Sequence, residues 1–102
     1  MPGLECLVAH KEGDVVGTVS FQIVPNLSHD DRPWAILENM VVNDKCRRQG
    51  FGRLLIEYVV GRCREAGCYK LQLLSNKKGG EAHEFYRSVG FEDSALGFRA
   101  YL

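Results

Sequence analysis

Six residues in the middle of the chain have the composition of an anion-binding loop. The run Arg47-Arg48-Gln49-Gly50-Phe51-Gly52 joins arginines to two glycines and leads into a helix-type pattern. The first turn of a helix has four unpaired N–H groups and carries about half a positive charge. Glycines let an anion approach that backbone closely, and arginines add charge and forked donors. The spacing therefore predicts a phosphate site here, with a tight turn that binds nothing as the alternative.

Two familiar phosphate loops do not fit this run. A nucleoside-triphosphate loop needs a Lys followed by Ser or Thr after its last glycine, and Gly52 is followed by Arg53-Leu54. A dinucleotide fingerprint needs a third glycine where Leu55 stands and an acidic residue about 20 positions later, and 69–74 contains none. The spacing alone thus leaves the phosphate ligand open.

Glu38 and Asn39 are the polar residues of the otherwise apolar segment Trp34–Val42. A carboxylate in a central strand could take part in proton transfer, or it could form an ion pair with a nearby arginine. Because side chains alternate along a strand, the two residues should face opposite sides unless a bulge intervenes. His29-Asp30-Asp31 could also serve a metal or acid–base site, but its turn-rich surroundings favour a structural role.

The elements that must position these residues follow from periodicity and turn residues. Apolar residues at Phe51, Leu54, Leu55, Tyr58 and Val59 predict an amphipathic helix that ends at Gly67. A second helix should run from about Ala82 to Val89 and end at Gly90, with His83 on its exposed face. The predicted strands are Leu4–His10, Val15–Val24, Trp34–Val42 and Tyr69–Ser75, with candidate terminal strands at Phe91–Asp93 and Leu96–Leu102.

This order, β-β-β-α-β-α-β, predicts an α+β fold built on a mixed sheet. The first three strands have short links and should be antiparallel, whereas the helix between the third and fourth makes that pair a parallel crossover. Ligands of such sheets bind near the carboxyl ends of strands. Here that position is the end of Trp34–Val42, where the glycine loop begins.

Composition narrows the class of protein. The 102 residues carry 13 basic and 13 acidic side chains, so we expect one domain over 1–102 and no nucleic-acid or membrane partner. Cys6, Cys46, Cys63 and Cys68 form no Cys-x-x-Cys pair and lie at no zinc-ligand spacing. We therefore expect no metal and no disulfide framework, with Cys6 and Cys63 as core thiols. We see no signal peptide before Leu4 and no apolar run of the roughly 20 residues that a membrane span needs. We therefore expect a cytoplasmic location.

Three segments in this order resemble the GNAT acetyltransferase superfamily. The loop 47–52 is similar to its Arg/Gln-x-x-Gly-x-Gly/Ala signature, Ile36–Val42 to the preceding strand, and Ala82–Phe91 to its helix with Phe-Tyr followed by Gly-Phe. The resemblance covers roughly 5–102. It implies a GNAT-like fold that usually begins with a further strand and two helices, which this chain lacks. Those helices usually help wall the acceptor pocket.

The resemblance also implies roles for individual residues. The loop backbone would hold the pyrophosphate of coenzyme A, and the pantetheine arm would pair with the third strand. Tyr86 would donate to the departing sulfur and Glu38 would act as base, although spacing alone favours a Tyr86 that only continues the apolar stripe of Ala82, Phe85 and Val89. Asn76 could bind the pantetheine or cap the next helix. The implied cofactor-binding residues are Met40, Val41, Val42, Arg47, Arg48, Gln49, Gly50, Phe51, Gly52, Arg53, Asn76 and Tyr86.

The function implied is that of an N-acetyltransferase. Acetyl-CoA would be the acetyl donor, with no metal, and a small-molecule or peptide amine of unknown identity would attack it directly in a ternary complex. A non-catalytic acyl-CoA-binding module is the alternative, and a nucleotide-binding regulatory domain is a third. The apolar segment Leu96–Leu102 makes a homodimer conceivable.

Overall fold

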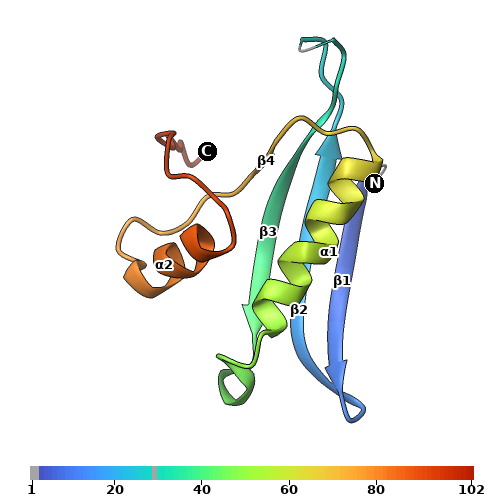
Figure 1. Ribbon diagram of the computed structural model, residues 1–102. Helices are drawn as coiled ribbons and strands as arrows, with labels where there is room; N and C mark the ends of the chain where they lie inside the picture. The colour runs from blue at the N-terminus through green and yellow to red at the C-terminus, as the bar shows by residue number, and fades with distance from the viewer. Residues whose placement is uncertain (1–2, 29) are drawn as a thin grey trace.

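The computed structural model describes residues 3–28 and 30–102 and contains a four-stranded mixed sheet in the order β1-β2-β3-β4 (Figure 1). Strands β1 (Leu4–Lys11), β2 (Asp14–Val24) and β3 (Trp34–Val42) are antiparallel neighbours, and β4 (Leu71–Gln72) is parallel to β3. The first three strands have almost the predicted limits. The predicted antiparallel part and parallel crossover are both confirmed.

Helix α1 (Phe51–Glu65) lies across one face of the sheet and closes the hydrophobic core (Figure 1). Its buried residues Leu55, Ile56, Val59 and Cys63 pack against buried side chains of the strands. Those strand residues are Val19, Phe21, Ala35 and Leu37. An ion pair at 2.9 Å between Arg62 Nε and Glu5 Oε1 also ties α1 to β1.

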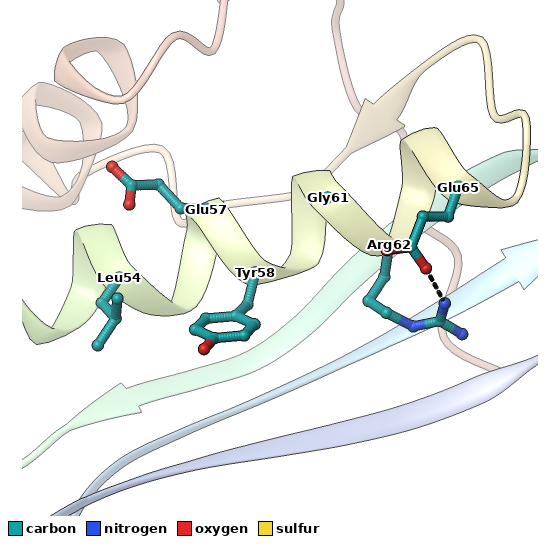
Figure 2. A pocket seen from close by; sticks show the side chains of 6 residues that line it. All are labelled: Leu54, Glu57, Tyr58, Gly61, Arg62 and Glu65. Atoms are coloured by element: carbon teal, nitrogen blue, oxygen red, sulfur yellow. Dashed lines mark hydrogen bonds and ion pairs between the residues drawn. The ribbon is translucent and has the colours of Figure 1, made fainter.

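The buried stripe of α1 is rotated relative to the predicted one. The spacing predicts Leu54 and Tyr58 in the apolar face, but they are 45% and 62% exposed, while Ile56 is buried. Figure 2 shows Leu54, Tyr58 and Arg62 in line along one side of the helix. The prediction is wrong here because apolar residues cover more than half of the helix circumference, so spacing alone does not select the stripe that faces the sheet.

The end of the chain differs from the prediction. The fourth strand has two residues instead of the seven of Tyr69–Ser75, and 91–102 contains neither helix nor strand. Strand backbone needs a neighbour to satisfy its N–H and C=O groups, and β4 offers too short an edge. Phe98 and Tyr101 are therefore 87% and 86% exposed. The core position predicted for Cys6 is also wrong, since this residue is exposed on β1.

A β-bulge interrupts β3 at its polar residues. Ser20 lies opposite Glu38 and Thr18 lies opposite Val41, so Val19 alone faces both Asn39 and Met40. Asn39 has a φ of 52°, in the left-handed region that asparagine tolerates better than most residues. The bulge resets the alternation of side chains, and Met40 packs against the core side of the sheet.

Helix α2 (Gly80–Ser88) lies beside β3, beyond the β4 connection (Figure 1). Gly67 after α1 and Gly90 after α2 have φ values of 81° and 104°, so both predicted left-handed helix ends are present. A short 3-10 turn, η1 (Asp44–Cys46), links β3 to the glycine loop. Within 3–28 and 30–102, no helix has the length and apolarity to traverse a bilayer.

Candidate active site

The backbone at the start of α1 presents a row of N–H groups that bond to nothing in the described chain. The first helical bond runs from Leu54 N–H to Gly50 O at 3.0 Å. No N–H between Arg48 and Arg53 has a partner among residues 3–28 and 30–102, and no side chain caps the helix. Gly50 caps it instead with a φ of 87°, and Arg48 also has a positive φ of 63°. This row has the arrangement of an anion site.

The side chains of the loop hold its shape. Gln49 accepts from Lys11 at 3.0 Å and donates to Lys45 O at 3.2 Å. Arg47 pairs with Asp44 at 3.0 Å, and Arg48 approaches Glu81 of α2 at 3.9 Å. Arg53 donates to Ser88 O at the end of α2, at 3.1 Å. Since exposed ion pairs contribute about 0–1 kcal/mol each, Arg47 and Arg48 remain able to move toward a ligand.

Gly52 lies where three elements meet. A Cβ placed on Gly52 would be 3.0 Å from Phe85 Cζ of α2 and 3.1 Å from Met40 Cε of β3. The second glycine of the loop is thus required by close packing, a reason that the sequence pattern did not reveal. This contact brings the start of α1, the bulged part of β3 and α2 to one place.

Strand β3 has an unpaired edge beside this place. Within the part of the chain that the structure describes, β4 pairs with Ala35 and Ile36 of β3 and with no later residue of that strand. Asn43 N–H donates to Val16 O of β2 at 2.8 Å, and backbone groups alternate between the two sides of a strand. The N–H groups of Met40 and Val42 therefore point to the open edge, whereas that of Val41 points toward β2. Of the three residues predicted here, two can offer a backbone donor.

Tyr86 lies on α2, next to Phe85, which touches the space beside Gly52. Its ring is half-buried and makes edge contacts with Phe85 at 5.4 Å and with Phe91 at 5.8 Å between centroids. Burial raises the pKa of the Tyr86 phenol above its usual value near 10. The hydroxyl stays protonated at neutral pH and can only donate to a developing anion there.

Glu38 projects from an exposed position directly before the bulge. Its backbone oxygen accepts from Ser20 Oγ at 3.1 Å. Its carboxylate forms no ion pair with any described residue, so the alternative of an arginine partner is not supported. The carboxylate is therefore open to solvent.

Asn76 and His83 differ from their predicted roles. Asn76 Oδ1 accepts from Lys78 N–H at 2.9 Å in a turn before α2, and the N-cap position of α2 is Gly79. The capping role suggested for Asn76 is therefore wrong, and its amide nitrogen remains the group that could meet a ligand. The exposed position predicted for His83 is also wrong, because this residue is half-buried with Nε2 2.7 Å from Asn76 O. The two residues together fix the loop before α2.

Two hollows of the described surface lie outside this meeting point. One of about 330 Å³ runs along α1 (Figure 2) and is lined by Leu54, Glu57, Tyr58, Gly61, Arg62 and Glu65. Another lies between the β1–β2 turn and η1. Neither hollow is lined by Gly52 or Tyr86. We therefore assign the site from the backbone N–H groups at the start of α1 and on the open edge of β3. No cluster of three metal-ligating side chains occurs in the described residues, and His29 lies outside them.

The sequence matches a model of a known protein family. The domain model described as "Acetyltransferase (GNAT) domain" matches residues 2–93. The chain therefore belongs to the GNAT acetyltransferase family. The resemblance drawn from the three sequence motifs is confirmed.

Individual relatives are similar over most of this chain. It is 34% identical over 79 residues, 78% of its length, to the glucosamine 6-phosphate N-acetyltransferase of Trypanosoma brucei brucei. It is 30% identical over 98 residues, 95% of its length, to the aminoalkylphosphonate N-acetyltransferase of Salmonella typhimurium. The chain spans 52% and 62% of these two relatives. A solved acetyltransferase candidate of Agrobacterium tumefaciens str. C58 superposes with a TM-score of 0.95 at 36% identity, covering 100% of this chain and 71% of that one.

Proposed function

We propose that this chain transfers an acetyl group from acetyl-CoA to a primary amine of a small molecule or peptide. The observation that carries the proposal is the row of unpaired N–H groups from Arg48 to Arg53 at the positive end of a 15-residue helix. Such a row suits the pyrophosphate of coenzyme A. Membership of the GNAT family and the two amine-acetylating relatives support the reaction type.

The open edge of β3 supports the placement of the donor's arm. An extended amide chain can bond to the N–H groups of Met40 and Val42 as a further strand would. One of these donors would stabilise the oxyanion that forms when the amine attacks the thioester carbonyl. A single preorganised donor of this kind contributes about 2.7–4 kcal/mol. The bulge at Asn39 lies directly before these two donors and interrupts the pairing of β3 with β2 there.

Glu38 and Tyr86 supply the proton transfers in this proposal. An alkylammonium with a pKa near 10.4 must lose a proton before attack, which costs about 4–5 kcal/mol at pH 7. The free carboxylate of Glu38 would take that proton, directly or through water. Tyr86 would donate a hydrogen bond to the departing thiolate. Because burial raises its pKa, complete transfer of its proton to sulfur is uphill, and stabilisation by hydrogen bonding is the favoured role.

A turnover assay tests the reaction. Release of the CoA thiol from acetyl-CoA is followed with a panel of amines that includes glucosamine 6-phosphate, an aminoalkylphosphonate, an aminoglycoside and a lysine peptide. We expect acceptor-dependent release with at least one of them. Binding of acetyl-CoA without release on any amine would favour the binding module instead. Equal affinity for ADP and CoA would indicate a nucleotide-binding domain.

A pair of glycine variants tests the loop assignment. A Cβ added to Gly50 or to Gly61 would meet no atom within 4 Å, but only Gly50 has a positive φ, at 87°. Alanine at Gly50 disfavours this conformation by about 1–2 kcal/mol, which corresponds to roughly 5- to 30-fold weaker binding of CoA if the loop relaxes. Gly61→Ala, in the same helix, is the control and should leave affinity unchanged. Equal dissociation constants for the two variants, measured by calorimetry, would refute the assignment.

A further inference from the structure

Two cysteines meet at the end of α1, away from the acetyl-transfer residues. Cys68 N–H donates to Cys63 O at 2.9 Å, and Gly67 N–H donates to Arg64 O at 3.0 Å. Gly67 has a φ of 81°. This pair of bonds around a left-handed glycine is the Schellman motif, in which the side chains at the two outer positions commonly touch. Here those positions are both cysteines.

The backbone geometry suits a bond between the two sulfur atoms. With an N···O distance of 2.9 Å between Cys68 and Cys63, backbone dimensions limit their Cα atoms to about 6.8 Å apart. Native disulfides join Cα atoms about 4.4–6.8 Å apart. Cys63 is buried in the core and Cys68 packs against the same cluster, so both side chains occupy one region.

The surrounding contacts hold the turn in this form. Arg32 donates to Gly67 O at 3.1 Å and to Cys68 O at 3.0 Å. Tyr69 N–H donates to Pro33 O at 3.0 Å. Cys68 is thus fixed from both sides of its peptide, while Cys63 is fixed by the helix.

We propose that Cys63 and Cys68 form a reversible intramolecular disulfide when the protein meets a peroxide. The Cys68 sulfur attacks one peroxide oxygen, giving a sulfenic acid and releasing water. The Cys63 sulfur then attacks the Cys68 sulfur, the S–S bond forms, and the sulfenic oxygen leaves as a second water. Two thiols are oxidised and one hydrogen peroxide is reduced to two waters, so the step balances.

The two thiols differ in a way that sets this order. Cys68 is half-exposed and can meet a peroxide, whereas Cys63 is 4% exposed. Burial, together with the adjacent Cys68, raises the pKa of the Cys63 thiol to about 11. Cys63 is therefore a poor first nucleophile. Its position next to Cys68 in the core, and not its pKa, is what suits it to resolve the sulfenic acid. The sequence alone does not indicate this pair, because Cys63 and Cys68 are brought together by the turn at the end of α1 and are not spaced as Cys-x-x-Cys.

Peptide mapping tests the proposal. The folded chain is treated with hydrogen peroxide, acid-quenched, alkylated and digested with trypsin, which cuts after Arg64, between the two cysteines. We expect the fragments Cys63–Arg64 and Glu65–Lys70 to appear joined, lighter by two hydrogens than their sum, and to separate on treatment with dithiothreitol. A variant with Cys6→Ser and Cys46→Ser keeps only the proposed pair and should give the same linked fragments.

A second variant supplies the control. Cys63→Ser with Cys68→Ser keeps Cys6 and Cys46, and it should form no intramolecular link under the same treatment. In a Cys63→Ser variant, Cys68 should pass to sulfinic acid because no resolving thiol remains. The proposal is overturned if the unsubstituted chain keeps both thiols alkylatable after oxidation. It is equally overturned if Cys68 reaches sulfinic acid while Cys63 stays free.

Discussion

Substituting alanine for Gly52 should disturb the close packing of Gly52 against Phe85 and Met40 in the proposed site. The added Cβ would be 3.0 Å from Phe85 Cζ and 3.1 Å from Met40 Cε. Carbon atoms in favourable contact lie about 3.5–4.0 Å apart, so the ring and the methyl group must each withdraw by about 0.5–1 Å. Phe85 is part of α2 and its neighbour is Tyr86, so a shift of this ring moves the proposed acid.

The size of the effect follows from two opposing contributions. Overpacking of this kind costs about 1–3 kcal/mol, and alanine in place of glycine returns up to about 1 kcal/mol in a helix. We expect a net loss of roughly 1 kcal/mol, which lowers the melting temperature by about 4–8 °C in a chain of this size. The Cβ added by Gly61→Ala would meet no atom within 4 Å, so this substitution should raise the free energy of unfolding by about 0.5–1 kcal/mol.

Urea unfolding and steady-state kinetics measure both consequences. The two alanine variants should differ by about 2 kcal/mol in the free energy of unfolding, with the lower value at Gly52. Turnover of Gly52→Ala should fall more than its affinity for acetyl-CoA. Adding Phe85→Leu shortens the opposing side chain and should recover part of the lost stability, as a double-mutant cycle would show. Equal stability of the two alanine variants would refute the packing argument.

Three further outcomes follow from the site and the core. Tyr86→Phe should lower kcat by about 10²-fold without changing the calorimetric affinity for acetyl-CoA, and unaltered kcat would contradict an acid role. Glu38→Gln should lower kcat/KM at pH 7, and the deficit should shrink as pH approaches the amine pKa near 10.4; a deficit independent of pH would exclude a base. Because the pKa of Cys63 is about 11 against 9.0 in the unfolded chain, its contribution to stability is full below pH 9 and is lost as pH rises to 11. Between pH 8 and pH 11, denaturant titrations should show a loss of stability that is smaller in Cys63→Ala by roughly 2–3 kcal/mol, while the loss from Tyr86, whose pKa is also raised by burial, remains.

The elements with strong local patterns were predictable from sequence. The alternation in Val15–Val24 located β2 within one residue, and Gly67 and Gly90 marked both helix ends because only a left-handed residue completes such turns. The loop 47–52 could be singled out because glycines before a helix leave the N–H groups accessible. Each of these patterns is formed by residues close together in the sequence, so it can be recognised without knowledge of the fold.

The remaining features depend on contacts between distant residues. The closeness of Gly52, Met40 and Phe85 arises from packing, and no spacing in the chain encodes it. From the sequence, a bulge at Asn39 was one of two possibilities, because the bulge depends on how β3 pairs with Val19 of β2. The segment 91–102 has strand-like composition, but strand formation needs an adjacent edge that β4 does not provide.

The open border of β3 also bears on how the molecule behaves in solution. A strand border with unmatched main-chain groups is a template on which another polypeptide can add, and it promotes self-association. If an acyl-CoA occupies this border, the same molecule shields it, and at 100 times its dissociation constant it adds about 2.7 kcal/mol to the folding free energy. The ligand-free protein should therefore aggregate sooner on heating, and adding CoA to the storage buffer should slow its aggregation.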